Sequence, residues 1–260
     1  MTTLRDPQRN SVFQSLKHLF QTVGAPLPVR LHLQEKNQIP LMSGLGSSAT
    51  ALVAGLAGAN ALLGFPFSMD KLAQMALQLE GHPDNVLPAL QGGIAVAAQS
   101  ADGEWSYLTF SPRSDLVAVI ALPDYALSTE LARQALPASY ERQAAIFNLQ
   151  HAGLLVGALV SGKYALLGAA MRDQLHQPYR SVLLPGFSEA IAAALQAGAY
   201  GAALSGAGPA VIALCEPGLR ARKVAEAMRE AYSNLGIGVR LAVPIPLSAV
   251  GLSVERVPTR

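Results

Sequence analysis

One stretch of the sequence, residues 39–65, most constrains how the chain can fold. It reads IPLMSGLGSSATALVAGLAGANALLGF: an apolar approach, a Gly/Ser turn and a long run of small apolar residues. The run predicts a helix that is apolar on most sides, and such a helix must be buried by other elements. The chain can supply them, because 260 residues suit one large domain or two small ones. With 51% apolar and 14% charged residues, intrinsic disorder is excluded.

Apolar periodicity predicts the elements around this helix. A second amphipathic helix is expected to begin after an N-cap, Ser68, and to end at Gly81, because serine and glycine favour those two positions. The alternation in Val-Arg-Leu-His-Leu indicates a half-buried strand. For the first part of the chain, the patterns predict helices over residues 10–23 and 68–80 and strands over residues 29–33, 92–98 and 116–121.

The pattern of elements changes beyond Pro123. Helical patterns there alternate with short apolar strands, so we predict two domains, residues 1–113 and residues 114–260. The segment AALSGAGPAVIAL at residues 202–214 indicates two strands joined by a Gly-rich loop. The second domain is also predicted to contain helices over residues 148–160, 163–175, 188–195 and 219–235 and a last strand over residues 239–243.

Charge, cysteine content and hydropathy argue against several classes of protein. With 19 basic and 17 acidic residues the net charge is +2, and nucleic acid is not expected as a partner. Cys215 is the only cysteine, which favours a reducing compartment. The N-terminal residues lack the order of a signal peptide, so a cytoplasmic location is predicted. Two apolar stretches, residues 48–65 and 152–171, are both interrupted, and no membrane partner is expected.

Residues 43–49, Ser-Gly-Leu-Gly-Ser-Ser-Ala, carry the strongest local signal for chemistry. Glycines let the backbone approach a ligand closely, and the unpaired N–H groups and the dipole of the following helix favour an anion. The loop is not a Walker A motif, because no lysine follows its last glycine. The alternative interpretation is a helix merely capped by serine after a glycine turn. A phosphate-binding loop here would comprise Ser43, Gly44, Leu45, Gly46, Ser47 and Ser48.

A second segment, Leu79–Val86, places four polar functional groups between a helix and an apolar run. Glu80 lies at the predicted end of that helix, where the dipole disfavours a carboxylate unless a cation or a donor offsets it. Mg²⁺ would be such a cation. The alternative interpretation is a solvated turn rich in turn-forming residues.

Four motifs together resemble the GHMP kinases, and within that family the members that phosphorylate homoserine. They are G-L-G-S-S-A, E-G-H-P-D-N followed by A-L-x-G-G, H-Q-P-Y-R at residues 176–180, and L-S-G-A-G-P at residues 204–209. The resemblance runs from about Asp6 to the last strand. It implies an α+β fold with a ribosomal-S5-like N-terminal domain and a ferredoxin-like C-terminal domain. It also implies ATP-dependent phosphorylation of the homoserine hydroxyl on the way to threonine, with both substrates between the domains, and is compatible with a homodimer.

The resemblance further implies roles for individual residues. The loop Gly44–Ser48 would wrap the triphosphate of ATP, with Ser47 as a phosphate donor and Ser48 and Glu80 as ligands of Mg²⁺. The residues implied to contact homoserine are His82, Asp84, Asn85, Thr129, Arg133 and Arg180. The residues implied to act in catalysis are Ser48, Glu80, Asn85, Arg133 and Arg180. The loop implied to close the cleft contains Gly206 and Gly208.

Two arginines suit a free amino acid, because each guanidinium offers planar, bidentate donors to a carboxylate. Taken singly, Arg133 or Arg180 would more often make a surface ion pair. Asp84 is the carboxylate of the acceptor segment that could take up a proton, whereas the resemblance favours a route without a dedicated base. Phosphoryl transfer through a loose transition state depends on positioning and charge neutralisation more than on a strong base.

One family motif is missing from the sequence. The family begins with N-x-G-P-G-F-D, and nothing similar precedes Asp6; the segment Asp6–Asn10 instead resembles a later D-P-x-x-N of the family. We therefore expect a chain truncated at its N-terminus, with an incomplete first sheet. Two alternatives stay open: an inactive remnant that binds ligands or is only structural, and a GHMP kinase for mevalonate or a sugar. The two arginines argue against a neutral sugar.

Overall fold

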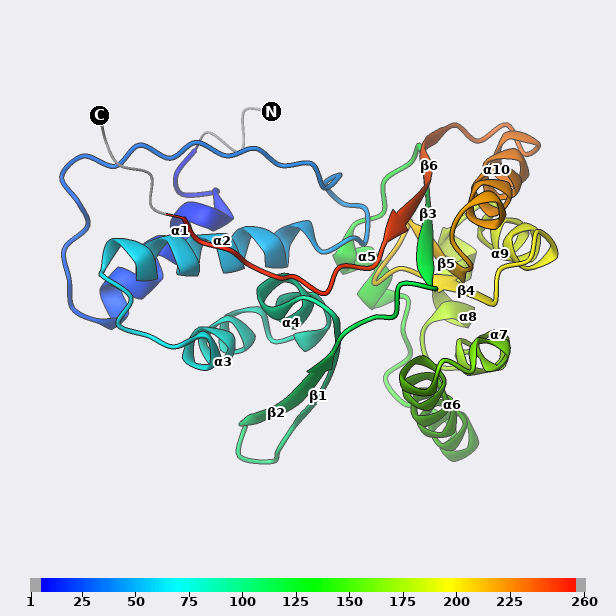
Figure 1. Ribbon diagram of the computed structural model, residues 1–260, viewed down its shortest axis with the longest axis horizontal. Coiled ribbons are helices and arrows are strands. Elements are labelled where there is room, and N and C mark those ends of the chain that lie inside the picture. Colours follow the sequence, from blue (N-terminus) through cyan, green and yellow to red (C-terminus); the bar gives the residue numbers. More distant parts are fainter. Residues whose placement is uncertain (1–5, 256–260) are drawn as a thin grey trace. The chain divides into compact units, whose positions relative to one another are not determined.

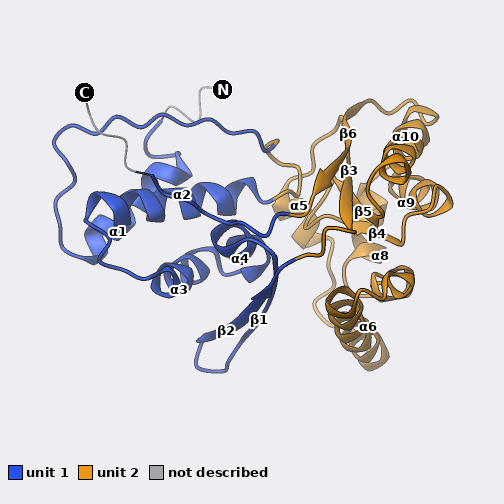
Figure 2. Ribbon diagram, in the orientation of Figure 1, with its two compact units in different colours: residues 1–39, 46–111, 248–260 blue, residues 40–45, 112–247 orange. Residues whose placement is uncertain are grey.

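The computed structural model describes residues 6–255 (Figure 1). The chain divides into two compact units, coloured separately in Figure 2. The first contains the residues up to 39, residues 46–111 and the residues from 248 onward; the second contains residues 40–45 and 112–247. The division is therefore discontinuous: a short segment before the second helix belongs to the second unit, and the C-terminal segment returns to the first.

The first unit is mainly helical. Its elements are α1 (Ser11–Thr22), α2 (Ser47–Leu62), α3 (Met69–Glu80), α4 (Pro83–Gln91) and a two-stranded antiparallel hairpin of β1 (Ile94–Gln99) and β2 (Trp105–Phe110). Apolar side chains from all four helices form one core, in which Leu19, Leu56 and Leu77 are fully buried. The predicted helices over residues 10–23, from residue 47 and over residues 68–80 are confirmed.

Local capping explains where the helices begin and end. Asn10 is the N-cap of α1, and its side chain accepts a hydrogen bond of 2.9 Å from Phe13 N. Ser68 caps α3 in the same way, accepting from Lys71 N at 3.3 Å, and Gly81 ends α3 in the left-handed conformation. Each cap satisfies backbone groups that a helix end leaves unpaired, so these boundaries follow from the local sequence.

Helix α2 is buried against α1 through a glycine. A methyl group added at Gly55 would lie 2.2 Å from the carbonyl oxygen of Val12, so only glycine lets the two helices approach this closely. Both Ala49 and Ala59 of α2 are also almost completely buried. The small residues of the run are therefore explained by close packing, as the sequence predicted.

The prediction of a strand over residues 29–33 is wrong. Residues 23–46 contain no helix or strand, and Val29 is fully exposed, although Leu31 packs against the core. The alternation of residues 29–33 has no neighbouring strand to pair with, and alternation alone does not hold a strand. The strands predicted over residues 92–98 and 116–121 are confirmed. Two further elements were not predicted: β2, which pairs with β1, and α4, which has Pro83 at its first position.

The second unit is built on a four-stranded antiparallel sheet in the order β4-β5-β3-β6. The strands are β3 (Val117–Pro123), β4 (Gly201–Leu204), β5 (Val211–Cys215) and β6 (Val239–Pro246). Helices α9 (Phe187–Gln196) and α10 (Leu219–Ser233) cover one face, where Val119 and Ala121 of β3 are fully buried. Alternate residues of β3, such as Leu122, face a second cluster that includes Ala158 and Leu167. The paired strands around the Gly-rich loop are confirmed.

Shorter helices surround this sheet. They are α5 (Thr129–Gln134), α6 (Arg142–Ser161), the 3₁₀ turns η2 (Tyr164–Leu166) and η3 (Ser181–Leu183), α7 (Leu167–Ala170) and α8 (Gln177–Arg180). The continuous helix predicted over residues 163–175 is wrong, because α7 ends at Ala170. The backbone N–H groups after it bond to the side chain of Asp173 instead of continuing a helix.

Within residues 6–255, one helix, α6, is long and apolar enough to cross a membrane, judged by length and composition alone. A single helix of this kind is weak evidence for a membrane span. This candidate span was not predicted, because the apolar stretch considered was residues 152–171, whereas α6 begins at Arg142 and ends at Ser161.

Candidate functional site

The N-terminus of α2 has a glycine in the capping position. Gly46 is the N-cap, with φ of 77°, and offers no side chain to the first turn of the helix. Ser47 and Ser48 lie inside that turn, Ser48 exposed and Ser47 half-buried. The interpretation of a helix merely capped by serine therefore does not describe this geometry. First-turn N–H groups without a side-chain cap are the groups that bind phosphate in other proteins.

The second motif, E-G-H-P-D-N, lies next to the start of α2 in the first unit. A methyl group added at Gly46 would lie 2.7 Å from Oδ1 of Asn85, so the Asn85 side chain lies directly against the glycine. Asn85 and Asp84 are in the first turn of α4, and His82 is its N-cap. The structure thus brings the start of α2 and the start of α4 together, and a larger residue at position 46 would displace Asn85.

Glu80 is the last residue of α3 and is half-buried. Its position at the negative end of the helix is the one that the sequence analysis regarded as unfavourable for a carboxylate without a cation or donor. Its carboxylate and the hydroxyl of Ser48 are both oxygen donors, the type of ligand that Mg²⁺ prefers. Residues 6–255 contain no group of three His, Cys, Asp or Glu side chains that could hold a metal ion, so the donor set does not match a closed protein metal site.

In the second unit, the first half of the phosphate-loop segment lies against the Gly-rich loop after β4. The hydroxyl of Ser205 donates to the carbonyl of Gly44 at 2.9 Å, and Ala210 N donates to the carbonyl of Ser43 at 3.2 Å. A methyl group at Gly44 would lie 2.2 Å from Ser205 O and 2.9 Å from Gly208 N. Glycine is therefore required at position 44, where φ is also positive at 76°.

Arg180 holds two backbone segments of the second unit. Its Nε donates to the carbonyl of Ala132 at 3.1 Å, and its Nη1 donates to the carbonyl of Gly206 at 3.1 Å. It therefore joins α5 to the Gly-rich loop. Burial lowers the pKa of Arg180 and the charge of Arg133 adds to this effect, whereas the carboxylate of Asp173 opposes it. Two guanidiniums this close form a positive region that favours an anion, and arginine keeps its charge in proteins.

Thr129 and Arg133 both belong to α5, whose N-cap is Ser128. They are four residues apart, so they lie on the same side of the helix. Both are exposed, whereas Arg180 is half-buried. The Ser128 hydroxyl accepts from Leu131 N at 3.1 Å and fixes the start of the helix. Of the predicted site residues, those of the second unit therefore gather around α5, the end of α8 and the loop of Gly206.

The predicted site residues divide between the two units. Those of the first unit are Gly46, Ser47, Ser48, Glu80, His82, Asp84 and Asn85. Those of the second unit are Ser43, Gly44, Leu45, Thr129, Arg133, Arg180, Gly206 and Gly208. The phosphate-loop segment belongs to both, because the boundary falls between Leu45 and Gly46.

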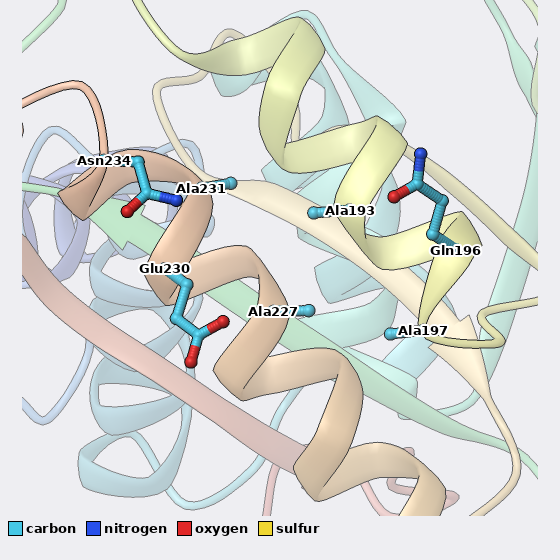
Figure 3. Close-up of a pocket in the computed structure, with 7 residues that line it drawn as sticks. All are labelled: Ala193, Gln196, Ala197, Ala227, Glu230, Ala231 and Asn234. Atoms are coloured by element: carbon cyan, nitrogen blue, oxygen red, sulfur yellow. The ribbon is translucent and has the colours of Figure 1, made fainter.

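A groove of about 430 Å³ lies elsewhere in the second unit, between α9 and α10 (Figure 3). Alanines form much of its lining, and their small side chains leave the space between the two helices open. Its lining residues are Ala193, Gln196, Ala197, Ala227, Glu230, Ala231 and Asn234. None of them is a predicted site residue, so this groove is separate from the proposed chemistry.

Sequence reasoning missed several side chains that organise these segments. Gln177 accepts a hydrogen bond from Leu204 N at 2.9 Å, and Asn37 donates to the hydroxyl of Ser47 at 3.1 Å. Asp173 accepts from three backbone N–H groups ahead of α8. Gln177 lies inside H-Q-P-Y-R, so the motif itself was the available signal. Nothing local in the sequence marks Asn37 as a partner of Ser47.

Comparison with known proteins defines the class. Residues 10–93 match the family described as GHMP kinases N terminal domain, and residues 155–234 match GHMP kinases C terminal. The chain belongs to the GHMP kinase family, and the predicted α+β GHMP kinase fold is confirmed. Members of this family are ATP-dependent kinases, so the chain is a kinase that uses ATP.

The relatives include homoserine kinases. A homoserine kinase of Synechococcus sp. is 45% identical over 247 residues, which is 95% of this chain and 80% of the relative. A homoserine kinase of Synechocystis sp. is 41% identical and covers 95% of this chain and 79% of its own length. Among solved structures, homoserine kinase from Cytophaga hutchinsonii has a TM-score of 0.83 and 31% identity, covering 95% of this chain and 79% of its own.

Proposed function

We propose that this chain is a homoserine kinase, which transfers the γ-phosphoryl group of ATP to the side-chain hydroxyl of L-homoserine and so serves threonine biosynthesis. Relatives with this name at 40–45% identity support the assignment. The structural observation that carries it is the start of α2, where a glycine N-cap lies directly against Asn85 of the second motif. A phosphate-binding helix start beside an acceptor-binding amide is the arrangement that phosphoryl transfer requires.

The nucleotide would be held by the start of α2. Backbone N–H groups of the first turn, with the hydroxyls of Ser47 and Ser48, would donate to phosphate oxygens. The hydroxyl of Ser205 and the N–H of Ala210 fix the preceding backbone at Gly44 and Ser43, so that segment is organised before a ligand arrives. Pre-organised donors of this kind lower the cost of ordering the site on binding.

We propose that Ser48 and Glu80 hold Mg²⁺. A bound Mg²⁺ supplies charge neutralisation to the phosphate oxygens. The side chains themselves contribute a hydroxyl and a carboxylate oxygen, and the carboxylate position at the end of α3 suits a cation.

The acceptor would be held by its carboxylate and its amino group. Arg133 and Arg180 form the positive region that suits the carboxylate, with Thr129 on the same side of α5. Asn85, His82 and Asp84, at the start of α4, would contact the remaining polar groups of homoserine. A loose transition state requires the hydroxyl to be positioned more than deprotonated early, so Asp84 need not act as a base.

For the protein's setting, we propose a cytoplasmic enzyme whose partners are ATP and homoserine, with a homodimer as its assembly. Near-balanced charge supports the absence of a nucleic-acid partner, and a single, buried cysteine supports a reducing compartment. Sedimentation equilibrium of the purified chain tests the dimer directly.

A substrate panel tests the proposed activity. The chain is incubated with ATP, Mg²⁺ and one acceptor at a time, homoserine, serine, threonine, mevalonate or galactose, and ADP release is followed. Homoserine should give the highest kcat/KM, and the product should be O-phosphohomoserine by phosphorus NMR. Preference for mevalonate or a sugar would assign a different GHMP kinase activity, and no turnover with any acceptor would favour a non-catalytic protein.

A further inference from the structure

Arg180 is the last residue of a helix that is too short to be stable by itself. Helix α8 contains only four residues, Gln177–Arg180. Isolated helices of this length are not stable in water, because nucleation costs more than a single turn returns. The orientation of the Arg180 guanidinium must therefore be set by contacts outside α8, and the candidate is the segment directly before it.

Asp173 provides those contacts. Its carboxylate accepts hydrogen bonds from the backbone N–H groups of Leu175 at 2.8 Å, His176 at 2.9 Å and Gln177 at 2.5 Å. Burial would raise the pKa of Asp173, but its hydrogen bonds outweigh burial and hold the pKa below its usual range. The carboxylate is thus charged at neutral pH and fixes the turn that leads into α8.

Asn148 of α6 holds Asp173 in turn. Its Nδ2 donates to Oδ1 of Asp173 at 2.6 Å, and its Oδ1 accepts from Gln174 N at 2.8 Å. Both ends of the amide are used, so the side chain has one favourable orientation. A long helix is therefore connected to the turn at Asp173 and at the next residue, Gln174.

The same short segment reaches the Gly-rich loop through two side chains. Gln177 accepts from Leu204 N, at the start of that loop, and Arg180 donates to the carbonyl of Gly206 within it. Arg180 also donates to Ala132 in α5, the helix of Arg133. A displacement of α8 would therefore move the arginine and loosen the loop that supports Gly44.

We propose that Asp173, oriented by Asn148, is a positioning residue for recognition of the acceptor. It holds α8 so that the Arg180 guanidinium stays beside Arg133 and available to the carboxylate of an amino acid. This role rests on the proposed function, because the carboxylate is that of homoserine. Asp173 itself touches neither substrate in this scheme, and it acts on Arg180 through backbone hydrogen bonds and through its negative charge.

The test compares Asp173→Asn with a matched control, Asp115→Asn. Asp115 accepts a hydrogen bond of 2.6 Å from the hydroxyl of Tyr164 and forms an ion pair with Arg113, in the same unit but without contact to α8. Asp173→Asn should raise the KM for homoserine about 10- to 100-fold, a loss comparable to that of a charge-assisted contact, and leave the KM for ATP within about two-fold. Asp115→Asn should change neither KM, whatever it does to Tm.

A double-mutant cycle separates positioning from general stability. In an Arg180→Lys background, Asp173→Asn should add little to the KM for homoserine, because the group that it positions is already altered. Equal and multiplicative effects of the two substitutions, or a fall in Tm with unchanged KM, would overturn the proposal. If Asp173→Asn does not fold, Asn148→Ala keeps the carboxylate and should raise the same KM by a smaller factor; an unchanged KM overturns the proposal.

Hydrogen exchange provides a readout that does not depend on activity. The amides of residues 175–177 and of Leu204 should exchange faster in Asp173→Asn, and those of β3 should not. If the wild-type chain fails to phosphorylate homoserine, the proposed function fails, while exchange still reports on the turn. If the wild type is active and neither exchange nor KM changes in the variant, the role of Asp173 is refuted.

Discussion

At the scale of single residues, the strongest constraint on the site is the absence of a side chain at Gly46. It leaves the first turn of α2 without a side-chain cap and makes room for Asn85. Two motifs that are separate in the sequence thereby meet in one place. The oxygens proposed for Mg²⁺, from Ser48 and Glu80, belong to the same unit, so their roles can be tested by small changes that keep the shape of each side chain.

Ser48→Ala and Glu80→Gln should each lower kcat by about 10²–10³-fold, because each removes one oxygen from a site that stabilises charge in phosphoryl transfer. The KM for homoserine should change much less. Steady-state kinetics with both substrates varied measures the two effects. A normal kcat in both variants, at saturating Mg²⁺, would exclude these side chains from the metal site.

Arg133→Lys should weaken homoserine binding by about 1–3 kcal/mol with little effect on ATP, because lysine keeps the charge but lacks the planar fork. Isothermal titration with homoserine and with a non-hydrolysable ATP analogue gives both affinities. Equal losses for the two ligands would place Arg133 away from the acceptor carboxylate. Arg142→Lys, an exposed arginine in the first turn of α6, serves as the control.

At the scale of elements, two glycines of α2 allow the effect of close packing on stability to be measured separately from the effect of helix propensity. Gly55 touches α1, whereas a methyl group at Gly58 would meet nothing within 4 Å. Gly58→Ala should therefore stabilise the protein by about 0.5–1 kcal/mol through helix propensity. Gly55→Ala should destabilise it by about 1–3 kcal/mol or more, because the added group overlaps Val12 O. Urea denaturation followed by circular dichroism measures both, and equal signs would contradict the packing of α1 on α2.

Elements with local signals were predictable, and those that depend on distant partners were not. The caps at Asn10 and Ser68 lie next to the helices that they begin, so α1 and α3 follow from the sequence. Residues 29–33 alternate like a strand, but a strand also needs a neighbour to pair with. In the site, the Gly/Ser loop was recognisable, yet its support by Ser205 joins residues 161 positions apart. No local pattern encodes such a contact.

At the scale of the whole molecule, the C-terminal segment closes the first unit. Gly93 N donates to Ser248 O at 2.8 Å, and Leu252 N donates to Leu90 O at 3.0 Å. Between these two hydrogen bonds the two segments of the chain lie so close together that a methyl group at Gly251 would lie 2.4 Å from Gly92 N. Two segments that are far apart in the sequence, residues 90–93 and 248–252, are therefore held in one unit by backbone contact.

Gly251→Ala should detach this segment from the first unit. In limited proteolysis of this variant, the first unit should then be cleaved before the second. The reason is steric, since the new methyl group overlaps backbone atoms that cannot rotate away. Mass spectrometry of the fragments identifies the first cleavages. Gly153→Ala, on α6 with nothing within 4 Å of the added group, should leave the wild-type cleavage pattern unchanged. Identical patterns for all three proteins would show that the contact does not hold the segment.

The strand order β4-β5-β3-β6 has a consequence for how the protein is made on the ribosome. β3 forms a ladder with β6, which follows the other three strands of this sheet in the sequence, and the segment after β6 packs in the first unit. While translation continues, β3 therefore keeps one edge unpaired, and such edges promote association between nascent chains. Both units lack part of their structure until residues 239–252 have been synthesised, so ribosome pausing before these codons should prolong the period in which chaperones can bind the chain.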